Sequence, residues 1–261
     1  MSQSVKICVV GPFGRMGARV VEACGADPRL HLHSVLVREI KEEDPRLKRL
    51  PEGCLVTALA RDALKGADVL IDFSAPAACG QLAPECVAQS VAYVVASTGL
   101  GDAEQKALDE AALKIAVLEA ANTSFGVNVL LELVQLASQR LEGFDPEIFE
   151  IHHRHKRDAP SGTAYALGQA VAAGRSGLTE VSGRCGEEPR GENELGYGAL
   201  RGGDVSGEHT VFFFGEGERL ELTHRSSTPG IFATGALKAA KWLVLKKPGR
   251  YTMRDATSHS H

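Results

Sequence analysis

The chain has 261 residues, of which 44% are hydrophobic and 24% are charged. This length suits one large domain or two of ordinary size, and the composition is sufficient for a buried core. With 29 basic and 33 acidic residues, the formal net charge of −4 argues against a protein built to bind nucleic acid or an anionic membrane. Any anion-binding site must therefore be local.

Six cysteines are present, none of them in a C-x-x-C pair, and most lie within apolar runs. They are predicted to be buried thiols of a reducing compartment rather than disulfides or zinc ligands. The N-terminal residues lack the apolar stretch of a signal peptide, and no run approaches the ~18 apolar residues of a membrane helix. We therefore expect a cytoplasmic protein.

Apolar runs alternate with helical patterns through the first half of the chain. We expect strands at residues 5–10, 30–37, 69–73, 91–96 and 115–120. We expect helices at residues 18–23, 61–67, 76–90 and 103–113. Such alternation with short links is typical of right-handed crossovers in a doubly wound parallel sheet, covered by helices on both faces.

The pattern changes after residue 122. We expect helices at 127–141, 161–173 and 235–245, and strands at 147–152, 209–214 and 219–224. Residues 174–208 show no periodicity and are predicted to form a long loop or lid. The prediction is an α/β chain with a smaller α+β domain at 126–234, whose sheet is mostly antiparallel. The closing helix is expected to return to the first domain, so that 235–261 completes 1–125.

A glycine-rich segment, GPFGRMG, joins the first predicted strand to the first predicted helix. Gly11 permits a tight turn, Gly14 lets a pyrophosphate approach the backbone, and Gly17 allows the helix to pack closely on the strand. The helix start adds free N–H groups and a positive dipole end. Pro12 and Phe13 replace part of the commoner G-x-G-x-x-G spacing, so a merely tight turn is the alternative. The surrounding α/β pattern favours a Rossmann-like dinucleotide-binding domain.

The residues after the second predicted strand, Val37-Arg38-Glu39, bear on the choice between NAD and NADP. An acidic residue there would bond the ribose hydroxyls, whereas a basic residue would bind the 2′-phosphate of NADP. The first position is apolar and Glu39 comes one place late. We interpret Arg38 as a phosphate contact and expect NADPH to be accepted; the alternative is that Arg38 and Glu39 are two solvated charges.

The segment at residues 150–164 reads EIHHRHKRDAPSGTA, and all six residues of its HHRHKR run can carry positive charge. Such a cluster repels itself unless an anion joins it. The Ser-Gly-Thr at 161–163 begins a predicted helix and supplies hydroxyls and free N–H groups, a second anion cradle. Together these features fit a small substrate with two carboxylates.

Two other interpretations of this segment are open. Zinc would need His152, His153 and His155, but a partner Cys or carboxylate at the usual spacing is lacking and the adjacent cations oppose a divalent metal, so we expect no metal. A solvated basic loop would favour lysine over three histidines. Histidine beside lysine is suited to acid–base chemistry near neutral pH.

These residues make the chain similar to the 4-hydroxy-tetrahydrodipicolinate reductase (dihydrodipicolinate reductase) family, nearly from end to end. The most specific segment is HHRHK followed by DAPSGTA, whereas the glycine loop is shared with many families. The segments that carry the resemblance are VVGPFGRMG at 9–17, VLIDFSAP at 69–76, ASTGL at 96–100, EAANTSFGVNVL at 119–130, EIHHRHKRDAPSGTA at 150–164, RGGDVSGEHTVFFF at 201–214, ERLELTHR at 218–225, FATGALKAAKWL at 232–243 and YTMRDA at 251–256.

The resemblance implies reduction of 4-hydroxy-tetrahydrodipicolinate, with loss of water, to tetrahydrodipicolinate in the diaminopimelate route to lysine, using NADPH or NADH. It implies that His152 is the acid/base residue and Lys156 the proton donor, and that His153, Gly162 and Thr163 bind substrate. The implied cofactor contacts are Gly11, Pro12, Phe13, Gly14, Arg15, Met16, Arg38, Ala96, Ser97, Thr98, Ala120, Ala121, Asn122 and Thr123. It also implies a homotetramer assembled through the sheet of the second domain.

Three positions depart from the family pattern. The family often has an acid at Val37, an aromatic residue at Thr123 and an arginine at Pro229. These changes concern cofactor preference, a contact near the nicotinamide, and a secondary contact or loop shape. Two other functions are weighed against this one. The first is an amino-acid or aldehyde dehydrogenase acting on another dicarboxylate, but no cysteine lies in the basic segment or at residues 122–124, which argues against a thiohemiacetal route. The second is a non-catalytic dinucleotide sensor, which would have no use for the basic segment.

Overall fold

The structure, a computed structural model, describes residues 4–39 and 43–258. The chain divides into two compact units. Unit 1 comprises Met1–Phe125 and Gly230–His261, and unit 2 comprises Gly126–Pro229. Within the described ranges, no helix has the length and apolar character needed to cross a bilayer.

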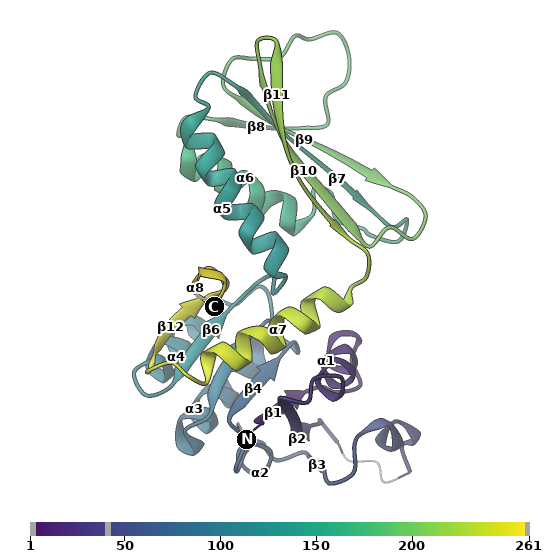
Figure 1. Cartoon of the computed structure of the whole chain (residues 1–261), viewed down its shortest axis with the longest axis vertical. Coiled ribbons are helices and arrows are strands. Elements are labelled where there is room, and N and C mark those ends of the chain that lie inside the picture. Colours follow the sequence, from purple (N-terminus) through teal and green to yellow (C-terminus); the bar gives the residue numbers. More distant parts are fainter. Residues whose placement is uncertain (1–3, 40–42, 259–261) are drawn as a thin grey trace. The chain divides into compact units, whose positions relative to one another are not determined.

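Unit 1 is built on a seven-stranded sheet in the order β12-β6-β5-β4-β1-β2-β3, in which every pairing is parallel (Figure 1). The strands are β1 Val5–Val10, β2 Leu30–Leu36, β3 Leu55–Thr57, β4 Val69–Asp72, β5 Ala92–Val95, β6 Ala116–Glu119 and β12 Gly249–Thr252. Chain order reverses between β1 and β4, which is the topological switch point of a doubly wound fold. The predicted fold class is confirmed.

Helices cover both faces of this sheet because its strands are apolar on both sides. One face packs against α1 Arg15–Gly25, α7 Gly230–Leu243 and α8 Met253–Ser258. The other packs against α2 Ala60–Leu64, α3 Cys79–Gln89 and α4 Asp102–Ala112. Short 3-10 turns, η1 Pro45–Arg49 and η2 Pro76–Ala78, lie in the connections. The sequence patterns did not indicate β3, β12, η1 or α8.

Unit 2 has a five-stranded mixed sheet in the order β11-β10-β7-β9-β8, with its helices on one face (Figure 1). Its elements are α5 Phe125–Arg140, β7 Asp145–His152, α6 Gly162–Gly174, β8 Thr179–Ser182, β9 Glu194–Arg201, β10 Gly207–Gly215 and β11 Glu218–Ser226. The predicted hairpin β10–β11 and its pairing with β7 are antiparallel, whereas β7-β9-β8 is parallel.

The prediction of a loop across residues 174–208 is wrong, because β8 and β9 lie within it. In β9, Gly196 and Gly198 are required by close neighbours: a Cβ at Gly196 would lie 1.7 Å from a carboxylate oxygen of Glu147, and one at Gly198 would lie 2.7 Å from the ring of Phe149. Glycine is normally depleted in strands. Packing on β7 therefore makes this segment a strand, although its glycines have a low strand propensity.

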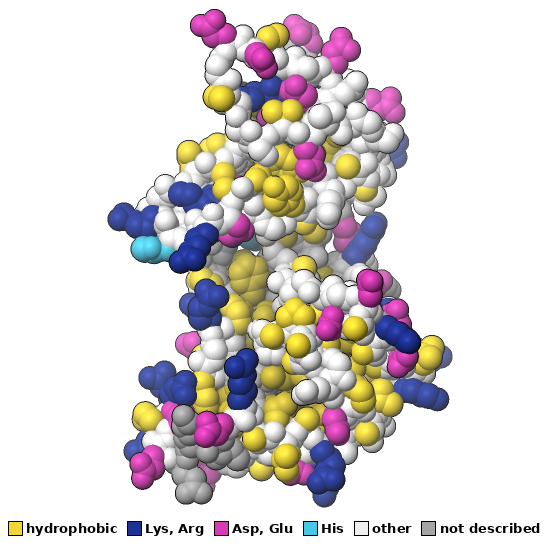
Figure 2. Space-filling view, turned by 180° about the vertical axis from the view of Figure 1, so that it is seen from behind, with side chains coloured by type: hydrophobic (Ala, Val, Ile, Leu, Met, Phe, Trp, Pro, Cys, Tyr) yellow, Lys and Arg dark blue, Asp and Glu magenta, His cyan; other side chains and the backbone are white. Residues whose placement is uncertain are grey.

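The helix-free face of the second sheet carries several apolar side chains, among them Phe149, Phe212, Phe214 and Leu200. The rings of Phe212 and Phe214 stack with centroids 5.4 Å apart. Elsewhere acidic and basic side chains are interspersed over the face drawn in Figure 2, as expected for a small net charge.

Candidate active site

The glycine loop leaves the carboxyl end of β1 and leads into α1. Gly11 has φ +63°, and its N–H donates to the carbonyl of Leu36 (2.9 Å), which ties the loop to the neighbouring strand β2. A Cβ at Gly17 would lie 2.1 Å from the carbonyl oxygen of Gly11. Only glycine fits at this contact, so the helix starts as close to the strand as a backbone can.

The start of α1 suits an anion. Gly14 is the N-cap and has no side chain with which to cap the helix, so the first-turn amides keep their capacity to bind a ligand. Arg15 is exposed beside them, and the ring of Phe13 lies under the guanidinium of Arg46 at 4.7 Å. These residues fit the pyrophosphate of a dinucleotide cofactor.

The other predicted cofactor residues follow the carboxyl ends of β2, β5 and β6. Arg38 is exposed just beyond β2. The N–H of Ala96 donates to Asp72 (2.8 Å), and that of Ala120 donates to Val95 (2.9 Å), so both loops are tied to adjacent strand ends. Since the carboxyl ends of parallel strands share one edge, the structure brings these loops to the edge of the sheet that holds the glycine loop.

Thr123 has a different role from the rest of this set. Its buried side chain donates to the carbonyl of Phe232 (2.7 Å) at the start of α7. A Cβ at Gly235 would lie 1.8 Å from the carbonyl oxygen of Thr123. The Thr123 hydroxyl is therefore occupied by an internal contact.

Sequence reasoning missed Asp72, which is buried at the end of β4 and accepts hydrogen bonds from Ser74 N–H (2.7 Å) and the hydroxyl of Tyr93 (2.9 Å).

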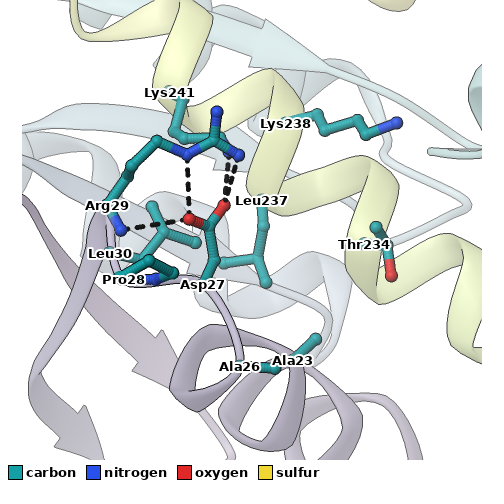
Figure 3. A pocket seen from close by; sticks show the side chains of 10 residues that line it. All are labelled: Ala23, Ala26, Asp27, Pro28, Arg29, Leu30, Thr234, Leu237, Lys238 and Lys241. Carbon is teal, nitrogen blue, oxygen red and sulfur yellow. Dashed lines mark hydrogen bonds and ion pairs between the residues drawn. The ribbon is translucent and has the colours of Figure 1, made fainter.

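A pocket of about 510 Å³ lies elsewhere in unit 1 (Figure 3). Asp27 accepts hydrogen bonds there from Arg29 (2.9 Å) and from Lys241 of α7 (2.6 Å), and these contacts hold its pKa well below the usual range. The pocket borders the end of α1 and Leu30, the first residue of β2. It is therefore at the opposite edge of the sheet from the glycine loop and is not the nucleotide site.

Replacing Gly17 by Ala should weaken both folding and dinucleotide binding, because the added methyl cannot fit against the Gly11 carbonyl. Overpacking of this kind lowers the free energy of unfolding by about 1–3 kcal/mol. Urea unfolding and calorimetric titration with NADPH measure the two effects. The control is Gly25→Ala, at the end of the same helix, where nothing lies within 4 Å of an added Cβ. Equal behaviour of the two variants would contradict the steric role of Gly17.

In unit 2 the basic segment begins at the end of β7. The strand alternates strictly, so that Glu150 and His152 point to the helix-covered face. A turn follows, with a cis peptide bond between Ala159 and Pro160, and α6 then starts at Gly162 with Ser161 as its N-cap. The Ser161 hydroxyl oxygen accepts from the N–H of Ala164 (3.2 Å).

Glu150, which sequence reasoning did not single out, is the centre of the hydrogen-bond network around the basic segment. Its carboxylate is fully buried and accepts two hydrogen bonds from the guanidinium of Arg201 (2.7 and 2.8 Å). It also accepts from the N–H of Ser161 (3.1 Å) and is hydrogen-bonded to Nδ1 of His152. Burial acts to raise the pKa of Glu150, but the bonds from Arg201 and His152 outweigh it, and the pKa lies below the ordinary value.

The His152 ring has a defined environment. Its pKa is lowered, first by burial and also by the charges of Lys156 and Arg201, although Glu150 acts in the opposite direction. The ring of His209 packs edge-on against it, with centroids 5.1 Å apart. An ionised carboxylate can only accept, so the proton of the neutral imidazole is on Nδ1, facing Glu150. This leaves Nε2 as an acceptor.

His209, on β10, was also missed. Its Nε2 lies 2.9 Å from the hydroxyl oxygen of Ser161, whereas its buried Nδ1 has no partner among the described residues. Burial lowers the pKa of His209 to about 4, with the nearby His152 acting in the same direction. The imidazole is therefore neutral at physiological pH.

Lys156 is engaged by the turn itself. Its ammonium donates to both carboxylate oxygens of Asp158 (2.9 Å each), and this contact lowers the pKa of Asp158. Nδ1 of His153 is buried and lacks a hydrogen-bond partner in the part of the chain that the structure describes. Gly162 and Thr163 form the first turn of α6, as the sequence predicts.

No group of three His, Cys, Asp or Glu side chains suited to a metal ion occurs in residues 4–39 and 43–258. The two buried histidines of the site hydrogen-bond protein partners instead, His152 the carboxylate of Glu150 and His209 the hydroxyl of Ser161. The arrangement is one for anion binding and proton transfer.

Stability should fall between neutral and acidic pH because His209 is buried in its neutral form. Its pKa is about 4 in the folded protein against 6.5 for an ordinary histidine, so the unfolded chain binds the extra proton as the pH drops. Between about pH 7.5 and about pH 4.5 the parent protein should lose about 2 kcal/mol more unfolding free energy than His209→Gln. Urea titrations at both pH values check this, and equal losses would contradict it.

A doubly wound sheet with a glycine loop suited to an anion, together with a histidine- and lysine-rich segment in a second unit, is typical of a nicotinamide-dependent oxidoreductase. Two family profiles match the chain: "Dihydrodipicolinate reductase, N-terminus" over residues 5–123 and "Dihydrodipicolinate reductase, C-terminus" over residues 126–256. The chain belongs to the dihydrodipicolinate reductase family.

Relatives with established names agree with this assignment. The 4-hydroxy-tetrahydrodipicolinate reductase of Thiobacillus denitrificans is 41% identical, over 97% of this chain and 98% of that protein. That of Anaeromyxobacter dehalogenans is 44% identical, over 96% of each. A dipicolinate-bound dihydrodipicolinate reductase from Paenisporosarcina has the same fold, with a TM-score of 0.80 at 22% identity, covering 97% of this chain and 99% of that chain. The predicted family and enzyme class are confirmed.

Proposed function

We propose that the chain reduces 4-hydroxy-tetrahydrodipicolinate to tetrahydrodipicolinate, with loss of water, in the diaminopimelate route to lysine. The observation that carries this proposal is family membership across both units, with identities of 41–44% over nearly the whole chain. NADPH or NADH supplies the hydride when bound. The residues at the carboxyl edge of the first sheet would hold it, since a cradle that only Gly17 fits and an uncapped helix start suit its pyrophosphate.

The chain's own residues would manage the proton and the substrate charge. Lys156 carries a proton on an ammonium that Asp158 now occupies, and a substrate carboxylate would compete for it. His152 offers Nε2 as acid/base group. His153, just after β7, and Gly162 and Thr163, at the start of α6, would bind the substrate carboxylates.

Lys156→Ala should lower kcat by ~10²- to 10⁴-fold, the usual contribution of a general acid, and leave NADPH affinity unchanged. The assay follows nicotinamide absorbance while dihydrodipicolinate synthase generates the substrate in the same cuvette. Lys114→Ala, on an exposed lysine of the other unit, is the matched control. Absence of turnover by the parent protein, where a known reductase turns over, would overturn the function; normal turnover by the variant would remove Lys156 from it.

Cofactor preference follows from the end of β2. Arg38 is exposed there and would bind the 2′-phosphate of NADPH, while Val37 cannot hydrogen-bond the ribose as an acid would. We propose that both cofactors are used, with Arg38 responsible for acceptance of NADPH. A cytoplasmic location would suit this biosynthetic reaction.

We further propose that unit 2 is the domain of substrate binding and tetramerisation, with the helix-free face of its sheet as the interface. Phe149, Phe212 and Leu200 give this face an apolar centre, and ion pairs such as Arg225–Glu208 (3.1 Å) lie around it. An apolar centre with a polar rim is the usual anatomy of an interface.

Phe212→Glu should dissociate the assembly, because it places a charge at the centre of this face. Sedimentation velocity or light scattering coupled to size exclusion would show a smaller species than the parent protein. Leu113→Glu, at an exposed leucine of unit 1, introduces the same charge away from the sheet and should leave the mass unchanged. A parent protein that is monomeric, or a variant of undiminished mass, would refute this interface.

A further inference from the structure

Glu150 connects the two elements to which substrate binding has been assigned. One carboxylate oxygen accepts from the N–H of Ser161, the N-cap of α6, and the other is hydrogen-bonded to His152 at the end of β7. The Arg201 guanidinium holds both oxygens and also donates to the carbonyl of Asp158 (2.6 Å), so the far end of the turn is fixed as well. The acid/base histidine and the helix start therefore share one anchor.

We propose that Glu150 is a positioning residue for the reduction: it holds His152 as the Nδ1–H tautomer, with Nε2 presented as the reactive acceptor, and keeps that ring in register with the first turn of α6. The inference rests on the proposed function for its kinetic consequence only, because the tautomer is a property of the resting protein. A residue acting in this way need not touch the substrate.

The surroundings of Nε2 agree with this role. No residue within the described ranges hydrogen-bonds His152 Nε2, and a Cβ at Gly207 would lie only 3.0 Å from it. Glycine at that position of β10 therefore keeps space beside the nitrogen. The charged and titratable groups around the ring are Glu150, Arg201, Lys156 and His209.

The donor count makes Glu150→Gln a decisive substitution. The amide NH₂ of Gln must replace one of the two oxygens, and the oxygen near Ser161 faces two obligate donors, the Ser161 amide and Arg201. The other oxygen faces Arg201 and His152 Nδ1, and only the histidine can become an acceptor, by moving its proton to Nε2. We therefore expect the tautomer of His152 to invert in this variant.

Nitrogen-15 NMR of histidine-labelled protein tests the inference without substrate or cofactor. His152 is assigned by the signal lost in His152→Asn. The parent protein should show a protonated Nδ1 and an unprotonated Nε2, and Glu150→Gln should show the reverse. Glu180→Gln, on edge strand β8 where the carboxylate accepts from Tyr197 (3.1 Å), is the control and should match the parent. A parent His152 with its proton on Nε2 would overturn the proposal even if the variant fails to fold.

Kinetics supply the second readout. In Glu150→Gln, kcat should fall ~10²- to 10⁴-fold with NADPH affinity unchanged, since the acid/base group is then in the wrong tautomer. The pH dependence attributable to His152 should also move to lower pH, because the carboxylate that favours its protonated form is gone. A variant with normal kcat and an unmoved profile would overturn the proposal. An inactive parent protein with the predicted tautomers would instead refute the function and leave the positioning intact.

Discussion

The hydrogen-bonded, buried carboxylate of Glu150 is the interaction on which the basic segment of unit 2 and its neighbouring elements depend. Burying an unpaired carboxylate is unfavourable by several kcal/mol. Here the fork of Arg201, the amide of Ser161 and the imidazole of His152 together satisfy both oxygens. Because these donors come from β9, the start of α6 and the end of β7, one charge fixes three segments, and the donor on β9 is 51 residues further along the chain. Without it, Arg201 would remain as a partly buried cation with no carboxylate.

The comparable constraint in unit 1 is steric rather than electrostatic. Gly17 packs so closely on Gly11 that no side chain fits, and the hydrogen bond from Gly11 to Leu36 keeps the loop at the edge of the sheet. A steric constraint does not change with pH, whereas a network of carboxylate, imidazole and guanidinium does. The pH dependence of the reaction should therefore arise in unit 2, and dinucleotide binding should vary less.

The alternating half of the chain could be predicted from sequence because its signals are local. The run at β1 and the glycine loop after it are contiguous, and both were placed correctly. The same is true of the basic turn and of Ser161 at the start of α6. The strands at 174–208 were missed because Gly196 and Gly198 lower strand propensity and are explained only by β7 beside them.

The missed site residues have the same origin. Glu150 stood inside the segment that was singled out, but its partner Arg201 is 51 residues further along the chain. His209 reaches Ser161 over a separation of 48 residues. The role of a buried polar group can be inferred only once its partners are known. The pairing of strands β7, β9 and β10 brings Glu150 and His209 to their partners. Signals in the sequence indicate which segment carries chemistry, whereas topology determines which side chains orient it.

The topology also changes the charge balance expected for the basic turn. The run from His152 to Arg157 was expected to require an anion, and two carboxylates of the chain already serve in part. Glu150 pairs with His152 of the run and with Arg201 beside it, and Asp158 pairs with Lys156. Apart from its histidines, the region holds four cationic side chains, those of Arg154, Lys156, Arg157 and Arg201, against these two carboxylates.

The remaining excess of two positive charges equals the charge of a dicarboxylate. The internal pairs thus stabilise the resting turn without cancelling its attraction for such a ligand. Exchange of Asp158 for a substrate carboxylate at Lys156 would preserve the number of ion pairs, so binding would need little charge reorganisation. This exchange of carboxylates is possible only because Asp158 is largely exposed, with 61% of its side chain accessible, and can be solvated when displaced.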